Sequence, residues 1–383
     1  FSHSFDAAVI NLYDAIDLLG TADVTLVGRD SGPVAGSVVF AGTGTGLSFM
    51  ASQRLAADTY DLRLASGEQG FRTVTGDLLD GNQDEVAGDD FVATLTVTAT
   101  PDVHVGLRSF ARAPGEVVNL SLATTAGIPL ELESAGNVTS LQLVVTHDVA
   151  LFDLYGIELA AGLPVDAALT VEDAGNGRLV IDVTSTTPLP AGRLTLAHLR
   201  GAVPSSAPAG AEAMFTVGEI EANGGQLAAA GHSAVQVAAR LGDTTADGQL
   251  SAVDGGLISR VAMRLDSGFA AYPRLDPRII GDVTENATIS MLDAAMVTGA
   301  AAELGSPGQY GPVAPSAPTP SRALLRHNRQ ARMFELADVS GLVAVSDNVL
   351  LKQALAGSSA QEQAFATMVA ALMEADSLAD DPE

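Results

Sequence analysis

Cysteine and tryptophan are absent from this chain of 383 residues, and Lys352 is its only lysine. Without cysteine the chain has no disulfide bonds, no thiolate metal site and no cysteine nucleophile. Basic residues are scarce as well, since 19 stand against 46 acidic ones, which argues against binding to nucleic-acid phosphates. No apolar run reaches the ~18 residues of a membrane span. The net charge of −27 favours a chain that attracts cations, or one that acidity simply keeps in solution.

Signals of catalysis are also scarce. The sequence does not exclude a carboxylate pair for glycoside hydrolysis, but most clustered acids lie in loops with a different pattern. With 12 phenylalanines and 5 tyrosines there is little surface for stacking on sugars. The six histidines show neither metal-ligand spacing nor a catalytic triad pattern. They are His3, His104, His147, His198, His232 and His327. We therefore expect a protein that is not an enzyme.

Residues 1–100 carry short apolar segments separated by turn residues. In the last of them Leu95 and Val97 alternate with threonines. Such spacing is typical of an antiparallel β-sandwich, so we predict one here. The opening residues, 1–6, are interpreted as the middle of a strand. We therefore expect a first domain that is truncated at its N-terminus, so that either a preceding segment supplies the missing strand or the true chain starts earlier.

Residues 101–239 repeat this style on a larger scale. Turns rich in glycine and proline, such as residues 204–210, separate six candidate strands. The candidate strands are residues 117–122, 141–145, 169–171, 179–183, 194–196 and 214–217. We predict a second antiparallel β-sandwich, in which several strands are apolar on both faces.

From residue 240 the sequence changes to two loops, each followed by an apolar pattern with helical spacing. Calcium takes about six to eight oxygen ligands, and a twelve-residue loop supplies them from alternating positions. In the first loop Gly248 stands at position 6, where this template turns sharply. The residues at positions 1, 3, 5, 7, 9 and 12 are Asp243, Thr245, Asp247, Gln249, Ser251 and Asp254. We predict a calcium site here, and a helix that begins at Asp254.

The second loop begins with the same Gly-Asp pair, Gly281 and Asp282. Its residues on the same positions are Asp282, Thr284, Asn286, Thr288, Ser290 and Asp293. Only two of them are carboxylates, and Ala287 replaces the glycine of the turn. Fewer charges and a less permissive turn should weaken the calcium site. The alternative is a loop that preserves the fold without a metal ion.

The paired loops of residues 240–304 resemble the dockerin module, because Gly-Asp-x-Thr followed by Ser-x-x-Asp recurs in both halves. The resemblance implies a calcium-binding module that recognises a protein partner through positions 10 and 11 of each loop. Those positions hold Ala252, Val253, Met291 and Leu292. All four are apolar, so we expect an apolar partner surface. Packing of these side chains inside the module is the alternative.

The preceding region resembles the cohesin domain, the partner fold of dockerins. The resemblance lies in residues 112–118, 138–143, 147–151 and 209–211. It implies a nine-stranded jelly-roll sandwich that binds a dockerin or, more loosely, carbohydrate. It assigns no binding residue, because that family recognises partners with a variable sheet face. A cohesin-like and a dockerin-like unit in one chain imply docking within the chain or head-to-tail assembly between chains, including a homopolymer.

An acidic loop lies just before the last strand of the first domain. Its candidate calcium ligands are Asp80, Asn82 and Asp84, with Asp89 or Asp90 returning to the same ion. They could enclose one ion, and the alternative is a solvated turn rich in Asp and Asn. The loop resembles the Asp/Gly-rich loop that often ends bacterial Ig-like domains of surface proteins, which implies an Ig-like fold for residues 1–100.

Two further segments complete the chain. Five prolines make residues 305–321 a semi-rigid linker, and a capping box ahead of an apolar pattern predicts a helical tail over residues 322–383. The sequence thus predicts a mainly β chain with two antiparallel sandwiches, a small helical dockerin-like module and a helical tail. We expect a calcium-binding, secreted or cell-surface protein of assembly or adhesion. The alternative is a carbohydrate-binding or scaffold component of a polysaccharide-degrading system.

Overall fold

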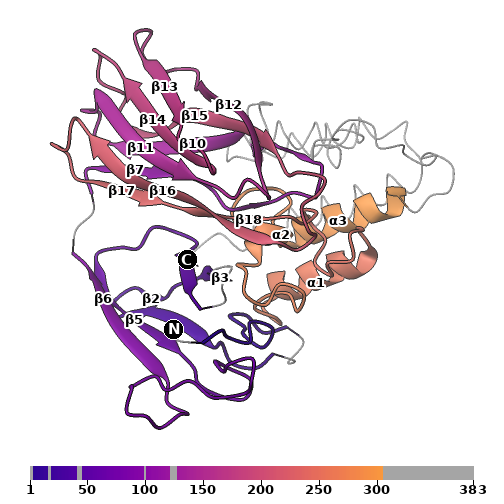
Figure 1. Ribbon diagram of the computed structural model, residues 1–383. Helices are drawn as coiled ribbons and strands as arrows, with labels where there is room; N and C mark the ends of the chain where they lie inside the picture. Colours follow the sequence, from indigo (N-terminus) through magenta and orange to yellow (C-terminus); the bar gives the residue numbers. More distant parts are fainter. Residues whose placement is uncertain (1–2, 16–18, 41–44, 99–100, 121–126, 305–383) are drawn as a thin grey trace, which may run out of the picture.

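The computed structural model describes most of the first 304 residues (Figure 1). The described ranges are 3–15, 19–40, 45–98, 101–120 and 127–304. Strands dominate them, which confirms the prediction of a mainly β chain. The predicted linker, residues 305–321, and the predicted helical tail, residues 322–383, lie outside the described residues. Within the described ranges no helix has the length and apolar character to cross a membrane.

The first unit contains a four-stranded antiparallel sheet of order β2-β1-β5-β6 and a separate hairpin, β3-β4. Val24 and Leu64 point inward from the sheet and meet Val38 of the hairpin, with Phe5 and Phe71 completing the core. The prediction of an Ig-like sandwich stays a prediction. The strands are β1 (Val24–Gly28), β2 (Gly32–Pro33), β3 (Gly36–Phe40), β4 (Leu47–Ala51), β5 (Asp58–Leu64) and β6 (Phe91–Val97).

The interpretation of the opening residues as the middle of a strand is wrong for the residues that the structure describes there. Phe5 forms one isolated antiparallel bridge, to Thr73, and no strand extends from it. The extended stretch ends because Asp6 Oδ1 accepts a hydrogen bond from the backbone N–H of Ala8 at 3.3 Å, which turns the chain.

The second unit is a sandwich of two six-stranded sheets (Figure 1). One has the order β12-β15-β10-β7-β17 with β9 beside β15, and the other has the order β13-β14-β11-β16-β18-β8. The first sheet comprises β7 (Val103–Gly106), β9 (Val117–Val118), β10 (Ile128–Ser134), β12 (Asp153–Leu159), β15 (Gly192–Ala202) and β17 (Ala229–His232). The second comprises β8 (Phe110–Ala111), β11 (Ser140–Thr146), β13 (Ala168–Asp173), β14 (Arg178–Thr184), β16 (Glu212–Ala222) and β18 (Ala234–Val237).

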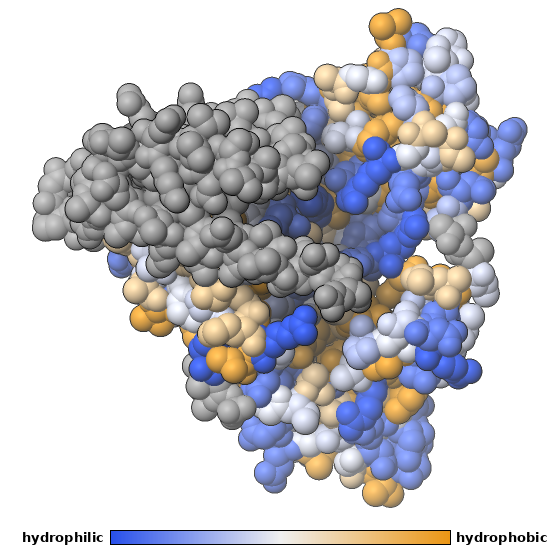
Figure 2. All heavy atoms as spheres, turned by 180° about the vertical axis from the view of Figure 1, so that it is seen from behind, coloured by the Kyte–Doolittle hydropathy of each residue, from blue (hydrophilic) through white to orange (hydrophobic). Residues whose placement is uncertain are grey.

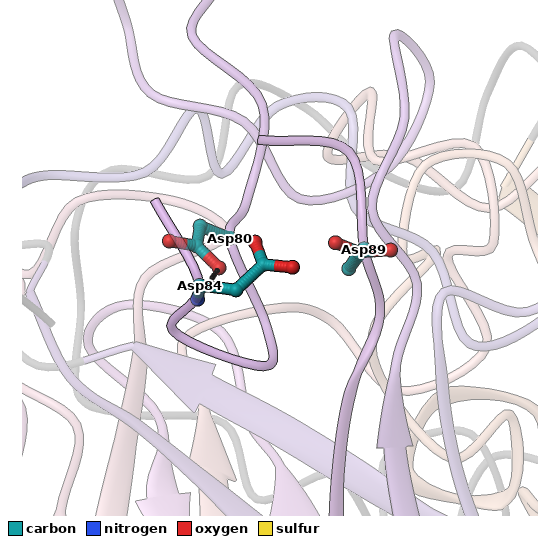
Figure 3. A group of neighbouring side chains, drawn as sticks. All are labelled: Asp80, Asp84 and Asp89. Carbon is teal, nitrogen blue, oxygen red and sulfur yellow. Dashed lines mark hydrogen bonds between the residues drawn. The ribbon is translucent and has the colours of Figure 1, made fainter. Parts of the chain in front are cut away.

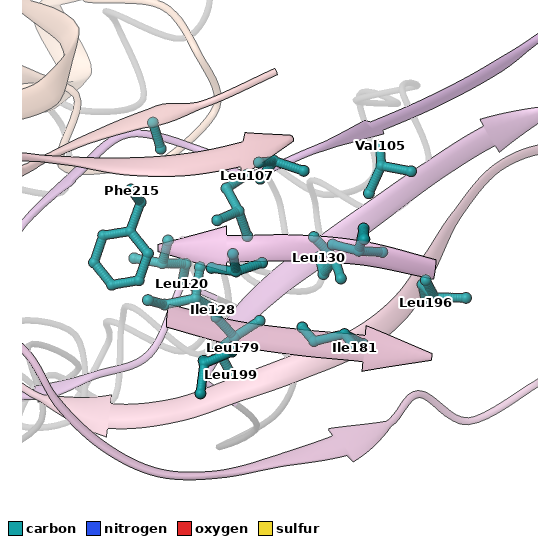
Figure 4. Close-up of a cluster of buried hydrophobic side chains, with 14 of the residues drawn as sticks. Val105, Leu107, Leu120, Ile128, Leu130, Leu179, Ile181, Leu196, Leu199 and Phe215 are labelled. Atoms are coloured by element: carbon teal, nitrogen blue, oxygen red, sulfur yellow. The ribbon is translucent and has the colours of Figure 1, made fainter. Parts of the chain in front are cut away.

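The sandwich core forms where the inward-facing residues of both sheets meet. On β14, buried Leu179, Ile181 and Val183 alternate with more exposed neighbours. They share a cluster with Ile128 and Leu130 of β10. Figure 4 shows Leu179 and Ile181 beside those two residues. Each fully buried aliphatic side chain stabilises the fold by roughly 1.5–3 kcal/mol. The alternation along β14 therefore contributes to the stability of the sandwich.

Both ends of the sandwich chain cross from one sheet to the other. In the first sheet β7 pairs in parallel with β17, and their continuations β8 and β18 pair in parallel in the second sheet. Sheets whose strands change sides in this way close the corners of a sandwich. The β8–β18 edge then faces the helices that follow in the chain, and β8 contacts the second of them.

The third unit, the helical module, consists of α1 (Ala252–Ala262), α2 (Arg278–Gly281) and α3 (Met291–Leu304). The helices α1 and α3 lie side by side and are in close contact at Gly255. A side-chain carbon at that position would lie 2.1 Å from Thr298 Oγ1 and 2.8 Å from the carbonyl oxygen of Ala294. Glycine is therefore required there for the two helices to pack.

The first helix begins at Ala252, two residues before the predicted start at Asp254. Ser251 is the N-cap residue, and its side chain accepts a hydrogen bond from the backbone N–H of Val253. The Asp254 side chain accepts from the N-cap backbone in return, which makes a capping box. The last turn of the loop and the first turn of the helix are thus the same residues.

A shared apolar cluster joins the helical module to the other two units. Leu275 and Ile280 of the module pack in one cluster with Val237 of β18 and Val39 of β3. The predicted domains, residues 1–100, 101–239 and 240–304, therefore meet in common apolar packing. Their predicted limits stay a prediction.

Hydrogen bonds fix the connection between α1 and α2 against the first unit. The N–H of Val38 donates to the carbonyl of Arg274 at 2.9 Å, and the N–H of Leu12 donates to the carbonyl of Pro273 at 2.8 Å. The Arg274 guanidinium donates to the carbonyl of Ala7 at 2.9 Å and to Glu212 of β16 at 3.2 Å. Arg274 therefore contacts all three units of the described structure.

Candidate metal centres

The first candidate loop, residues 243–254, is closed by its first and last carboxylates. Asp243 accepts hydrogen bonds from the N–H of Gly248 at 2.7 Å and of Asp247 at 3.2 Å. Asp254 Oδ1 accepts from the N–H and from the hydroxyl of Thr245, both at 3.0 Å. The Thr245 hydroxyl also lies 3.2 Å from Asp243 Oδ1. The carboxylates of positions 1 and 12 therefore converge on the hydroxyl of position 3.

Two other predicted ligands of this loop have local partners. The N–H of Gln249 donates to Asp247 Oδ1 at 2.8 Å, and the side chains of both residues are exposed. The Ser251 hydroxyl donates to Asp254 Oδ2 at 2.7 Å. Ser251 therefore fixes the carboxylate of position 12 while capping α1.

The second loop, residues 282–293, repeats these contacts. Asp282 accepts from the N–H of Ala287 at 2.7 Å and of Asn286 at 3.1 Å. Asp293 Oδ1 accepts from the N–H of Thr284 at 2.9 Å, and the Thr284 hydroxyl donates to Asp282 Oδ1 at 3.1 Å. The two loops have therefore folded into the same arrangement from different sequences.

The remaining ligand positions of the second loop also match the first. The N–H of Thr288 donates to Asn286 Oδ1 at 2.9 Å, as Gln249 does to its own position-5 residue. The Ser290 hydroxyl donates to Asp293 Oδ2 at 2.9 Å, and Ser290 accepts from the N–H of Leu292 at 3.2 Å. Position 9 caps the following helix in both loops.

The backbone of both loops is left-handed at positions 4 and 6. In the first loop these are Ala246 and Gly248, with φ of 60° and 83°. In the second they are Glu285 and Ala287, with φ of 58° and 71°. Because glycine adopts this conformation without steric cost and alanine does not, position 6 of the second loop is strained.

The acidic loop of the first unit contains the same turn. Asp80 accepts from the N–H of Asp84 at 3.3 Å and of Glu85 at 3.0 Å, as the first aspartates of the other loops accept from positions 5 and 6. Gln83 and Glu85, at positions 4 and 6, have φ of 64° and 71°. This equivalence was not predicted from the sequence. The Asp-x-Asn-x-Asp spacing from Asp80 was the signal that could have revealed it.

Three carboxylates of this acidic loop converge, as Figure 3 shows for Asp80, Asp84 and Asp89. Each offers an oxygen within 4.8 Å of the oxygens of the other two. In the described ranges no other group of three acidic or histidine side chains lies this close together. The three aspartates of the first loop of the helical module, residues 243–254, do not lie this close together either. Asn82 directs its amide nitrogen at Asp84 and Asp89, 3.2 Å from each.

Asp90 is not part of this group, although the sequence offered it as an alternative to Asp89. Its carboxylate is 2.6 Å from Nη2 of Arg63 and accepts from the N–H of Ser66 at 2.8 Å. An ion pair and a backbone contact therefore hold Asp90 against the neighbouring strand. Asp89 is the residue that returns to the acidic loop.

Burial shifts the pKa values of carboxylates in the two loops of the helical module, residues 243–254 and 282–293. Burial raises the pKa of Asp282 to about 6, with the neighbouring charge of Asp293 adding to the shift. Burial also opposes ionisation of Asp254, but hydrogen bonds from Ser251 and Thr245 hold its pKa below the ordinary value. A buried carboxylate is costly unless hydrogen bonds or a cation compensate it.

The donor set of all three loops suits a hard cation. The predicted side-chain ligands are carboxylate, amide and hydroxyl oxygens, without the nitrogen or sulfur donors that zinc and copper favour. Asp243, Asp254, Asp282 and Asp293 are at most 6% exposed. Within the described residues none of these four forms an ion pair with a basic side chain. The chemistry of the donors therefore fits a calcium ion in each loop, although only the acidic loop brings three carboxylates of the described residues together.

The four predicted recognition positions differ in exposure. Ala252 is exposed, and Val253 is 61% exposed at the start of α1. Met291 and Leu292 are half-buried at the start of α3. The alternative that these side chains pack inside the module therefore applies in part to the second pair and not to the first.

The second loop borders a cleft of about 620 Å³ where the three units meet. Asp282, Glu285 and Ala287 line it on the module side, opposite Arg54 and Arg193. The hollow between the sandwich and the first unit, seen from behind in Figure 2, is lined in part by hydrophilic side chains. None of residues 243–254 lines this cleft, so the two helical loops face different surroundings.

No protein-family model and no curated protein matches the chain. Several solved cohesin structures resemble about a third of it. A non-cellulosomal cohesin from the archaeon Archaeoglobus fulgidus is 14% identical, covering 36% of this chain and 90% of that one, with a TM-score of 0.30. The sixth cohesin of scaffoldin B from Acetivibrio cellulolyticus, solved with a Cel5 dockerin, is 16% identical and covers 35% and 97%, with a TM-score of 0.30. A type I cohesin from Pseudobacteroides cellulosolvens is 11% identical and covers 36% and 92%, also with a TM-score of 0.30. At these TM-scores we rest no conclusion on the likeness.

Proposed function

We propose that this chain is a non-catalytic, calcium-stabilised modular protein that joins other proteins in an extracellular or cell-surface assembly. Calcium at three loops stiffens the units and the contacts between them. The helical module presents an apolar face to a protein partner. The scaffold of a polysaccharide-degrading system is one setting in which such a protein would serve.

The observation that carries the calcium proposal is the set of buried carboxylates that form no ion pair with a basic side chain in the described residues. Asp243 and Asp254 in one loop, and Asp293 in the other, are compensated by hydrogen bonds, and Asp282 is compensated by hydrogen bonds and by the nearby charge of Arg278. Buried charges in proteins are normally paired or coordinate metals. The same turn at Asp80, with three converging carboxylates, extends the argument to the first unit.

The residues that would hold the ions follow from these loops. Asp243, Thr245, Asp247 and Asp254, with the backbone of Gln249, would serve the first loop. The residues that would serve the second are Asp282, Thr284, Asn286, Asp293 and the backbone of Thr288, and those that would serve the acidic loop are Asp80, Asp84 and Asp89. Bound calcium would supply the positive charge that these carboxylates lack. At a free concentration of 100 times Kd, one such ion would add about 2.7 kcal/mol to the stability of the fold.

The exposure of the first recognition pair supports a partner outside this chain. The module contacts its own sandwich and first unit through the connection between α1 and α2 and through the second loop. Ala252 and Val253 lie on neither contact and remain exposed. Docking within the chain therefore leaves this pair free for another protein or another copy.

Scanning calorimetry of the full chain in calcium and in chelator tests the calcium part. We expect a higher Tm in calcium, with magnesium at the same concentration much less effective because it demands a smaller octahedral site. An unchanged Tm would contradict it.

The assembly part is tested by sedimentation velocity in calcium, with wild type and Val253→Asp compared. Self-association that Val253→Asp abolishes would identify a second copy as the partner. A wild-type monomer would place the partner in another protein. Association that persists in Val253→Asp would contradict the assigned face.

A further inference from the structure

A buried arginine of the sandwich is paired with the second loop of the helical module. Arg112, directly after β8, is 2% exposed. Its Nη1 donates to the carbonyl of Ala111 at 2.7 Å, and its Nη2 donates to the carbonyl of Asn119 at 2.8 Å. The same Nη2 donates to Glu285 Oε1 at 2.6 Å. Glu116 also lies close enough to Arg112 to interact with its charge.

Glu285 occupies position 4 of the second loop, between two predicted ligands. It is one of the two left-handed residues of that loop, with φ of 58°. Its side chain is 17% exposed and is directed at the sandwich. Position 4 of the first loop is Ala246, which has the same backbone conformation and is exposed. The two loops are therefore alike inside, and only the second is fastened to another unit at this position.

The second loop is also the one that needs external support. Its position 6 carries Ala287 in a conformation that favours glycine, and its position 5 carries an amide where the first loop has a carboxylate. A contact that fixes the backbone at position 4 restrains the turn on which positions 3, 5 and 6 depend. If the ion pair between Arg112 and Glu285 broke, the guanidinium would remain buried and would lose its closest acidic partner.

We propose that Arg112 is a positioning residue for the second loop. Through Glu285 it holds that loop in the conformation that receives a cation, so that cation binding there and docking of the module on the sandwich strengthen each other. This inference rests on the proposed calcium function. The reciprocity follows from linkage, because each event must favour the other by the same factor.

The sign of one mutational effect separates this proposal from simple electrostatics. If Arg112 acted on the loop only through its charge, removing that charge would tighten calcium binding, because a nearby positive charge repels Ca²⁺. If Arg112 positions the loop, the same substitution weakens binding. Arg112→Met keeps most of the buried volume and removes the charge and the donors.

The experiment is hydrogen exchange with mass spectrometry on the full chain over a series of free calcium concentrations. Peptides covering residues 243–254 and 282–293 report the two loops separately. In Arg112→Met we expect the calcium midpoint of the second loop to rise about tenfold and that of the first loop to stay unchanged. Arg112→Lys, which keeps the charge and one donor, should recover part of the shift. Arg178→Met, which removes another sandwich arginine from an exposed pair with Glu219, is the matched control and should shift neither loop.

Each outcome decides between the two claims. Calcium-dependent protection of both wild-type loops, with an unchanged or lower second-loop midpoint in Arg112→Met, overturns the positioning role and leaves the calcium function in place. Calcium-dependent protection of the first loop alone in wild type likewise overturns the positioning role and leaves the calcium function in place. No protection of any loop in wild type overturns the calcium function itself. If Arg112→Met does not fold, Arg112→Lys decides, because a positioning role requires its midpoint to rise.

Discussion

Exchanging the residues at position 6 of the two helical loops should change their stability in opposite directions. Ala287 and Gly248 have φ of 71° and 83°. The left-handed conformation costs an L-residue roughly 1–2 kcal/mol. Alanine recovers about 0.4–1 kcal/mol relative to glycine, because it restricts the unfolded chain. The balance favours glycine at both positions by about 0.5–1 kcal/mol.

Steric contacts do not complicate this comparison. A side-chain carbon built on Gly248 would meet no atom within 4 Å. Ala287 is exposed, so removing its methyl group leaves no buried cavity. The pair therefore isolates the effect of the backbone angle.

Urea unfolding of Ala287→Gly and Gly248→Ala, in chelator, is the assay. We expect Ala287→Gly to raise and Gly248→Ala to lower the free energy of unfolding of the transition that includes the helical module. If calcium binds only this left-handed conformation, the same free-energy difference changes the calcium Kd of the loop about two- to fivefold, as measured by calorimetry. A destabilised Ala287→Gly together with an unaffected Gly248→Ala would refute the assignment of the two turns.

Three further substitution sets follow from the same loops and from one buried acid. Asp254→Ala should destabilise the chain by about 2–4 kcal/mol even in chelator, because several buried donors lose their acceptor. Asp247 is exposed, so Asp247→Ala should cost at most about 0.5 kcal/mol in chelator and should act only on calcium affinity. Chemical denaturation with and without calcium measures the effect of both substitutions. Asp89→Asn should abolish the calcium-induced rise in Tm of the first unit, and Asp90→Asn should preserve that rise while losing about 0.5–1 kcal/mol of its exposed ion pair. Burial raises the pKa of Asp23 to about 6. Its contribution is therefore complete below about pH 4 and is lost as the pH rises through 6, so Asp23→Asn should flatten the pH dependence of the urea midpoint in that window.

Local patterns predicted the parts of the fold that local patterns determine. Five of the six candidate strands of the sandwich lie within observed strands, where side chains such as Leu179 and Ile181 reach the core. Of the sixth, residues 117–122, only Val117 and Val118 form a strand, and residues 121–122 lie outside the described ranges. The candidates left out six sandwich strands, β7, β8, β10, β12, β17 and β18, and β10 shows one reason. Its first three residues are all buried and include Pro129, so it lacks both alternation and a typical strand composition.

The candidate loops were predictable because calcium ligands follow a fixed spacing in the sequence. What the sequence could not predict were the contacts between units. Arg112 and Glu285 are separated by 173 positions, and nothing near either residue indicates the other. The choice of Asp89 over Asp90 likewise depends on Arg63, which lies on the neighbouring strand β5.

The central claim is that the three loops are calcium sites, and calorimetric titration of the full chain with calcium tests it most directly. The loops at Asp80, Asp243 and Asp282 predict saturable binding of about three ions per chain, reduced by about one ion in Asp84→Ala and by about one in Asp247→Ala. A chain that binds no calcium at millimolar concentration would contradict the claim.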